Sequence, residues 1–224
     1  MDNFDLKKVR KKYKDNRDVI SFFSGAMGLD IGLEKAGLNV VIGQDFEPSC
    51  VETMRANGHN IREINPETLL KLTGLHVGEP FMVCGGPPCQ PFSTAGKRLG
   101  INDPRGSLFM DFIRMIDYIR PRFFVMENVK GIVSSPLKHV SVKEREKDDP
   151  EQQLGTVLDV ILSEFDKLGY KTVYGVLDAV NYGVPQFRER FVLIGSRDNE
   201  DIFLPMPTHF QMHQNSEYRW KTVG

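Results

Sequence analysis

Short apolar runs typical of buried strands alternate with helical patterns along most of this chain of 224 residues. The strand-like runs lie at 18–23, 40–43, 81–84, 123–126, 172–177 and 191–195. The helical patterns between them lie at 29–35, 48–56, 67–72, 106–119 and 154–168. This alternation predicts an α/β fold with a mostly parallel sheet and helices on both of its faces. The length is enough for one sizeable domain of this class, but hardly for two.

Composition argues against several other classes of protein. Hydrophobic residues make up 40% and charged residues 26% of the chain, which is typical of a globular domain. No apolar stretch approaches the length of a membrane span and no signal peptide is present, so we expect a cytoplasmic protein without a membrane partner. The three cysteines, Cys50, Cys84 and Cys89, form neither an even disulfide set nor a CxxC pair, and we therefore expect no metal site.

The charge of the chain is nearly balanced, with a net value of −1, which argues against a wholly basic surface for nucleic acid. The exception is the basic run KKVRKKYK at 7–14. This run fits either contacts with phosphates or a solvated terminus. Residues 1–17 are therefore expected to be a basic extension that precedes the first strand.

Cys89 lies in the segment GGPPCQPFS at 85–93, directly after an apolar run that ends at two glycines. The flanking prolines fix their own φ angles and restrict the residues before them, so the cysteine is expected on a stiff, extended backbone. This geometry suits a thiolate that has to be directed at a substrate. The alternative is a buried cysteine that acts as a small hydrophobic residue, which needs neither the two glycines nor the three prolines.

Two further segments indicate a nucleoside-containing cofactor. The turn Phe23–Gly28 contains two glycines and links the first strand to a helix, where backbone N–H groups can approach a ligand. After the second strand, Asp45 can bind two ribose hydroxyls and Phe46 can stack on an adenine. Asp45 can equally form the turn ahead of the helix at 48–56. Because the turn is not a GxGxxG fingerprint, the pattern does not say which nucleoside is bound.

Glu127 follows the strand-like run at 123–126, and Arg188 and Arg190 lie at the start of the last run. A carboxylate at the end of a buried strand is costly unless it is paired or used, although it can also cap a neighbouring helix. Two arginines at alternate positions point to one side of an extended chain and suit an anionic or carbonyl-rich ligand, with surface arginines on an edge strand as the alternative. We expect Glu127, the arginines and Cys89 to face one crevice at the sheet edge.

These segments resemble, in the same order, the sequence blocks of the DNA cytosine-5 methyltransferase family. The matching segments are 23–28, 45–46, 86–93, 102–108, 127–129 and 186–190. The resemblance implies a Rossmann-like, S-adenosylmethionine-dependent methyltransferase fold and a prokaryotic enzyme of restriction–modification type, associated with the nucleoid. It also implies that residues 18–197 form the catalytic and cofactor-binding domain, and that 198–224 form a tail leading toward a target-recognition region.

The resemblance further implies a role for each matching residue. Cys89 adds to C6 of a cytosine rotated out of double-stranded DNA, and Glu127 holds the N3 and amino edge of that base. Arg190 bonds the O2 side of the base, Arg188 is structural or faces a phosphate, and the loop at 92–103 closes over the site. The residues implied to bind S-adenosylmethionine are Phe23, Ser24, Gly25, Ala26, Gly28, Asp45, Phe46, Asn60, Ile61, Gly86, Pro88 and Leu108.

The chain departs from the family pattern at several places. Met27 stands where the family usually has glycine, and Asn60 stands where it usually has aspartate. The target-recognition domain and the last motifs of the family have no counterpart in this sequence. We therefore expect that target choice is not encoded here, and that a second subunit or a C-terminal segment completes the enzyme.

Two other functions remain open at this point. One is an inactive remnant that binds only the cofactor or a partner, and the other is an RNA cytosine-5 methyltransferase. An oxidoreductase that uses Cys89 for redox chemistry is disfavoured, because the dinucleotide fingerprint and the second cysteine of a redox pair are both missing.

Overall fold

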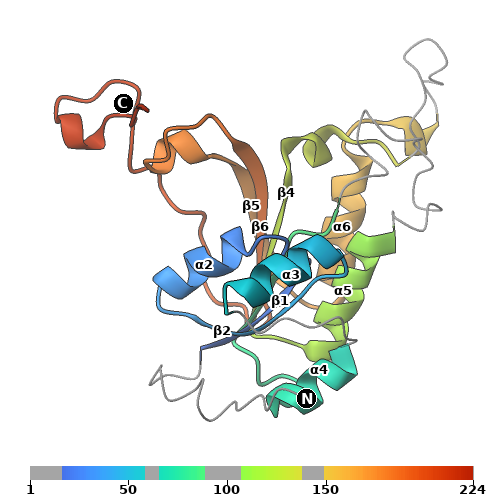
Figure 1. The fold of residues 1–224 in the computed structure, drawn as a ribbon. Coiled ribbons are helices and arrows are strands. Elements are labelled where there is room, and N and C mark those ends of the chain that lie inside the picture. The colour runs from blue at the N-terminus through green and yellow to red at the C-terminus, as the bar shows by residue number, and fades with distance from the viewer. Residues whose placement is uncertain (1–16, 59–65, 89–106, 138–148, 224) are drawn as a thin grey trace.

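A computed structural model describes residues 17–58, 66–88, 107–137 and 149–223 of the chain. These residues form one six-stranded sheet in the order β2–β1–β3–β4–β6–β5, with helices packed against it (Figure 1). The strands are β1 (Asp18–Phe22), β2 (Asn39–Gln44), β3 (Met82–Gly85), β4 (Phe123–Val129), β5 (Lys171–Asp178) and β6 (Glu189–Ser196). The first four are parallel, and β6 runs antiparallel to both β4 and β5. The predicted α/β fold with a mostly parallel sheet is therefore confirmed.

The described helices match the periodic patterns in the sequence, with ends that differ by at most two residues. They are α2 (Gly28–Lys35), α3 (Pro48–Ala56), α4 (Pro66–Thr73), α5 (Ser107–Ile119) and α6 (Thr156–Lys167). Short 3₁₀ helices are η3 (Lys130–Ser134), η4 (Pro150–Gln152), η5 (Ala179–Tyr182) and η6 (Ser216–Tyr218). α6 begins two residues later than predicted, because Gly155 before it has a left-handed backbone with φ of 87° and Leu154 is exposed.

The sheet is covered on both faces, and every residue of β1 is buried. Ile20 and Phe22 belong to the main hydrophobic core, to which α4, α5 and α6 also contribute. Within this core the ring of Phe124 on β4 stacks on Phe165 of α6, with ring centroids 4.0 Å apart. Because side chains alternate along a strand, Ser21 points to the opposite face, which α2 and α3 cover.

β4 is longer than the sequence indicates, and this changes the position of Glu127. The apolar run ends at Met126, but Glu127, Asn128 and Val129 continue the strand because they pair with Val192, Phe191 and Arg190 of β6. Glu127 therefore lies inside a strand and not after its end.

The tail after β6 returns to the sheet edge at which the parallel strands end (Figure 1). The backbone N–H groups of Thr208 and His209 both donate to the carbonyl oxygen of Asn181, at 2.9 Å. The Trp220 indole N–H donates to Oδ1 of the same residue at 3.0 Å, and its ring meets Phe187 edge-on. Asn181 lies in η5, which follows β5 directly and whose Ala179 N–H donates to the Arg188 carbonyl, so it attaches the tail beside the segment that carries Arg188.

Candidate active site

A cavity of about 540 Å³ opens where β1, β3 and β4 end. It lies at the end of β1. The chain places β2 on one side of β1 and β3 on the other, so the strand order reverses at β1. This is the position at which open α/β sheets bind ligands. The described lining consists of residues 21–30 without Met27, together with Gly85, Gly86, Glu127 and Arg188. The cavity thus joins the glycine turn, the start of the cysteine loop and two of the residues predicted to hold a base.

The turn between β1 and α2 has an unusual backbone. Phe23, Gly25 and Met27 all have positive φ angles, of 53°, 54° and 59°. The N–H of Met27 donates to the Ser24 carbonyl at 2.8 Å, and the Ser24 hydroxyl donates to the Ser21 hydroxyl at 2.9 Å. No side chain caps the first turn of α2. Within the turn, the N–H groups of Ser24, Gly25 and Met27 donate to the Gln44 carbonyl, to Asp45 Oδ2 and to the Ser24 carbonyl. The N–H groups available to a ligand are therefore those of the uncapped first turn of α2.

Met27 occupies the position at which the resembling family usually has glycine. Its side chain does not line the cavity. A left-handed backbone costs a residue with a Cβ roughly 1–2 kcal/mol. The Met27 side chain is only 2% exposed and packs against Met54 of α3, which offsets this cost by burying apolar surface. The substitution is therefore accommodated inside the protein, and Met27 does not line the cavity.

Asp45 has a structural function that the sequence left as an alternative. Its side chain is buried, with Oδ2 accepting from the Gly25 N–H at 2.8 Å and Oδ1 accepting from the Glu47 N–H at 2.9 Å. The first bond ties the cofactor turn to the end of β2, and the second forms the turn ahead of α3. A carboxylate can accept about four hydrogen bonds, so sites for ribose hydroxyls remain.

Phe46 presents an exposed aromatic surface beside this carboxylate. The ring is 47% exposed and meets Phe23 edge-on, with centroids 6.3 Å apart. It lines a hollow of about 730 Å³ that α3 borders with Pro48, Val51 and Arg55. A planar base can stack on such a ring.

The loop that leads to Cys89 is tightly fixed at its start. A Cβ on Gly85 would lie 2.5 Å from the Phe22 carbonyl oxygen, and a Cβ on Gly86 would lie 3.3 Å from Oε2 of Glu127. The buried Asn128 side chain donates from Nδ2 to the Pro87 carbonyl at 2.9 Å. Its Oδ1 accepts from the Val129 N–H at 2.8 Å. β4 therefore supports the loop directly, and the sequence reasoning gave Asn128 no such role.

Glu127 and Arg190 form an ion pair across the β4–β6 ladder, with Arg190 Nε 2.8 Å from Glu127 Oε1. Both side chains are about one-third exposed, so the pair is accessible to a ligand. Arg188 lies just before β6, where its N–H donates to Asp178 Oδ1 at 2.8 Å, and it lines the cavity with Glu127. The two arginines and the glutamate therefore lie together, as predicted. Of the two, Arg190 makes the contact with Glu127.

Several predicted site residues lie outside the described part of the chain. They are Cys89, Asn60, Ile61 and the whole loop at 92–103. Pro88 and Leu108 are described and half-buried, and Leu108 is the second residue of α5.

The other two cysteines are poor nucleophiles. Burial raises the pKa of the Cys84 thiol far above its usual value, and the negative charge of Asp30 raises it further. Burial also raises the pKa of Cys50, with a smaller contribution from Asp45. Since the thiolate is the reactive form, these shifts disfavour both Cys84 and Cys50 as nucleophiles.

Comparison with known proteins decides the family. The model of the C-5 cytosine-specific DNA methylases matches residues 17–223. The chain belongs to this family. It is 37% identical over 206 residues to the type II methyltransferase M.AquIA of Picosynechococcus sp., covering 88% of this chain and 79% of that protein. It is 38% identical over 190 residues to M.FnuDI of Fusobacterium nucleatum, covering 82% of this chain and 48% of the relative. With M1.HphI of Haemophilus parahaemolyticus it shares 38% identity over 197 residues, covering 85% of this chain and 48% of that protein.

Solved structures of methyltransferases share the fold. A putative DNA modification methyltransferase encoded within an E. coli prophage superposes with a TM-score of 0.60 at 24% identity, covering 81% of this chain and 47% of the other. The S. pombe Dnmt2 methyltransferase superposes with a TM-score of 0.59 at 17% identity, covering 83% and 51%. The chain thus spans about half the length of M.FnuDI, M1.HphI and these two solved methyltransferases, and 79% of M.AquIA.

The cofactor of the C-5 cytosine methylases is S-adenosylmethionine, and the described residues fit it. Phe23, Ser24, Gly25, Ala26, Gly28 and Gly86, all expected to contact the cofactor, line the cavity. Asp45 bonds the Gly25 N–H of the turn that lines the cavity, and the ring of Phe46 meets that of Phe23, which also lines it. The backbone N–H groups of the uncapped α2 suit the carboxylate of the methionine moiety.

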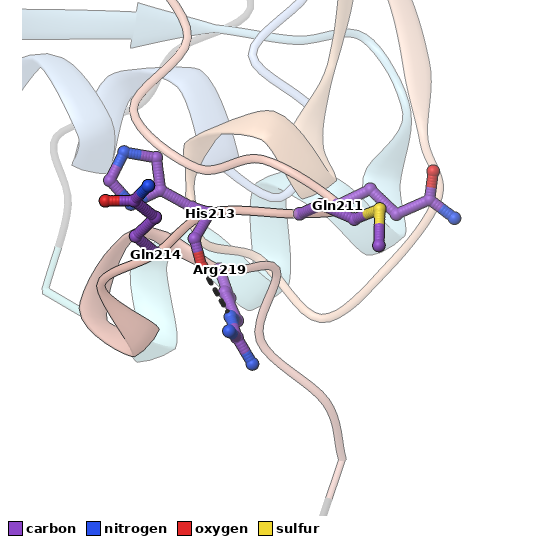
Figure 2. A pocket seen from close by; sticks show the side chains of 5 residues that line it. Gln211, His213, Gln214 and Arg219 are labelled. Atoms are coloured by element: carbon purple, nitrogen blue, oxygen red, sulfur yellow. Dashed lines mark hydrogen bonds between the residues drawn. The ribbon is translucent and has the colours of Figure 1, made fainter.

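Other features of this methylase lie apart from the cavity. The tail holds a hollow of about 450 Å³ lined by Gln211, Met212, His213, Gln214 and Arg219, in which the Arg219 Nε donates to the His213 carbonyl (Figure 2). It contains none of the predicted site residues. Among the described residues, no cluster of three potential metal ligands is present. No helix in the same part of the chain is long and apolar enough to cross a bilayer.

Proposed function

We propose that this chain transfers a methyl group to C5 of cytosine in double-stranded DNA, through a transient bond between Cys89 and C6 of the base. The observation that carries the proposal is the ion pair of Glu127 and Arg190, whose carboxylate lies against Gly86 at the start of the cysteine loop. One carboxylate and one guanidinium at this distance can bond neighbouring edges of a cytosine. The same base would then lie within reach of the residue three positions after Gly86.

The chemistry follows from this placement. The Cys89 thiolate gives an electron pair to C6, and the ring electrons displaced by this bond make C5 nucleophilic. S-adenosylmethionine, when bound, supplies an electrophilic methyl group. C5 would take this group as its bond to the cofactor sulfur breaks, which leaves the electron pair on sulfur and releases S-adenosylhomocysteine. C5 then loses its proton to a base, and the Cys89–C6 bond breaks to restore the double bond. The target cytosine has to leave the stack, because C6 is otherwise covered by neighbouring bases.

Glu127 and Arg190 control the charge of the base. Glu127 hydrogen-bonds the N3 and amino edge and supports protonation at N3, so negative charge does not accumulate on the ring. Arg190 holds Glu127 in orientation through Oε1 and bonds the O2 side of the base. Asn128 supports the loop through Pro87, so that the thiolate approaches C6 from a fixed direction.

We also propose that a second polypeptide, or a further segment, carries target recognition. M.FnuDI and M1.HphI are each about twice as long as the region that this chain matches. Substrate choice would then be separate from the chemistry described above. Since the relatives with similar sequences are bacterial type II methyltransferases, we propose that the enzyme acts on DNA at the nucleoid, in the cytoplasm.

Transfer of labelled methyl groups from S-adenosylmethionine to unmethylated DNA tests the proposal. We would assay the chain alone and mixed with the product of the adjoining reading frame, with Cys89→Ser as the inactive variant and Cys50→Ser as the matched control. Activity that Cys89→Ser abolishes and Cys50→Ser retains is the expected result. Transfer to transfer RNA but not to DNA would show an RNA methyltransferase. Cofactor binding without transfer to either would show a non-catalytic remnant.

A further inference from the structure

The segment after β6 carries a concentration of exposed apolar side chains. Among the described residues, the most exposed large apolar side chains are those of Phe187, Phe203, Met206, Met212 and Val223, which are between 73% and 89% exposed. Four of these residues lie within 203–223, a segment that we call the apolar arm. Single exposed apolar residues are ordinary, but a concentration of them in one short segment is typical of a surface that another molecule covers.

Hydrogen bonds hold the apolar arm in place. The Tyr182 hydroxyl donates to the Pro205 carbonyl at 2.8 Å, in addition to the bonds at Asn181 described above. The Phe210 N–H donates to the Tyr218 carbonyl at 2.8 Å and closes a hairpin, which forms the red end of the chain and stands away from the sheet in Figure 1. The exposed side chains therefore belong to an element of fixed structure that projects toward solvent.

The apolar arm has few of the charges that binding to nucleic acid requires. Its only acidic residue is Glu217, and its only Lys and Arg residues are Arg219 and Lys221. Both cations donate to carbonyl groups within the arm, Arg219 to that of His213 and Lys221 to that of Glu217. DNA-binding surfaces neutralise phosphates with several Lys and Arg residues, whereas the centres of protein interfaces are poor in charge and rich in Met and aromatic residues. The arm therefore fits a protein better than DNA.

The position of the apolar arm indicates which protein this is. The arm is attached at Asn181 in η5, and the Ala179 N–H of η5 donates to the carbonyl of Arg188, which lines the cavity. A molecule on the arm would thus lie beside the segment that carries the two arginines.

The relatives show how much further chain the family can contain. M.FnuDI and M1.HphI are about twice as long as the region matched by this chain, whereas M.AquIA is matched over 79% of its length. The additional half of the longer relatives can therefore be absent from a chain of this family.

We propose that the apolar arm is the docking site of a second polypeptide, the one that carries target recognition. The inference rests on the proposed function, because it assigns a docking surface to the partner proposed there. The partner covers the arm with an apolar face of its own, since burial of apolar surface is the dominant favourable contribution to most protein association. It then lies beside Arg188, where it can contact the base pairs next to the target cytosine.

The test compares two double variants that carry the same change at different places. Met206→Asp with Met212→Asp places two charges on the arm, at side chains that make none of the hydrogen bonds described above. Val77→Asp with Leu154→Asp is the matched control, because both side chains are exposed and lie outside the arm. Circular dichroism shows whether the variants fold, and calorimetry measures the dissociation constant for the product of the adjoining reading frame.

The arm variant is expected to weaken this complex by about tenfold or more, and the control to leave the dissociation constant within about twofold. In methyl transfer by the mixture, the arm variant is expected to need about tenfold more partner for half-maximal activity. Its kcat at saturating partner is expected to match that of the wild type, because the change affects docking and not the chemistry. If the double variant does not fold, Met212→Asp alone replaces it, with Val77→Asp as its control.

Equal losses in the arm variant and the control, no loss in the arm variant, or no complex with the wild-type chain would overturn the inference. Weaker binding of the arm variant to DNA in the absence of the partner would also overturn it, because the arm would then be a DNA contact. A complex that depends on the arm but transfers no methyl group would leave the inference in place and refute the proposed function, which distinguishes the two failures.

Discussion

Asn128 is expected to hold the cysteine loop in place, and Asn128→Ala tests this directly. The variant removes the bond from Nδ2 to the Pro87 carbonyl and the bond from the Val129 N–H to Oδ1. Both Asn128 and Pro87 are buried, so water does not readily replace the lost donor at the Pro87 carbonyl.

The expected cost follows from these two bonds. A buried carbonyl left without a donor costs about 1–3 kcal/mol, and the loss of the second bond costs about 1 kcal/mol. Val129 is 47% exposed, so its N–H is more accessible to water than the Pro87 carbonyl. We therefore expect Asn128→Ala to lower the free energy of unfolding by about 2–4 kcal/mol.

Asn57→Ala is the matched control. The Asn57 side chain also donates to a backbone carbonyl, that of Thr53 at 2.8 Å, but it is exposed. Its removal is expected to cost at most about 0.5 kcal/mol. Urea unfolding followed by far-ultraviolet circular dichroism measures both variants, and trapping of Cys89 by DNA that contains 5-fluorocytosine measures the effect on the loop. Equal stability losses in the two variants, with unchanged trapping by Asn128→Ala, would refute the reasoning.

Three other changes give independent checks. Gly85→Ala is expected to lower the free energy of unfolding by about 1–3 kcal/mol or more, because its Cβ would lie 2.5 Å from the Phe22 carbonyl oxygen and 2.9 Å from Phe112. Gly32→Ala is the control: a Cβ there would have nothing within 4 Å, and the change is expected to stabilise α2 by about 0.5–1 kcal/mol. Urea unfolding that ranks the two variants in the opposite order would contradict this. Glu127→Gln is expected to lower kcat for methyl transfer by about 10²–10⁴-fold. Its affinity for S-adenosylhomocysteine, measured by calorimetry, is expected to stay nearly unchanged. A variant as active as the wild type would exclude the proposed role of Glu127 in supporting protonation at N3. Burial raises the pKa of Tyr170 from 10.0 to about 12, so the folded state keeps the phenol proton after the unfolded chain has lost it. The contribution of Tyr170 to the free energy of unfolding is therefore expected to be complete below pH 10.0 and to decrease as the pH rises toward about 12. A Tyr170→Phe variant whose free energy of unfolding falls with pH as steeply as that of the wild type over this range would argue against it.

The helices and strands were largely predictable because their signals are local. Pro48 starts α3, since its fixed φ suits the first helical position and its missing N–H is not needed there. Gly169 follows the end of α6 with a left-handed backbone at φ of 79°. Apolar periods of two and of 3.6 residues identified the remaining elements, because each depends on neighbours in the chain.

The candidate site was predictable to the extent that its residues follow the ends of strands. The turn at Phe23–Gly28, the Asp45–Phe46 pair and Gly85 and Gly86 at the start of the cysteine loop lie where the sequence places them. The role of Asp45 in bonding the Gly25 N–H was not predictable in the same way. It depends on the parallel pairing of β1 with β2, which brings their ends together.

The sequence by itself therefore determined the order of strands and helices along the chain, the family, and which residue types are available for catalysis. Only the tertiary structure decided which of these residues meet. Glu127 reaches Arg190 because β6 lies antiparallel beside β4 in a register that pairs Val129 with Arg190. Asn128 reaches Pro87 because β3 and β4 are neighbours, and the Met27 side chain is buried because α3 covers it. Strand order and register are set by the burial of the whole sheet, and no local stretch of sequence contains that information.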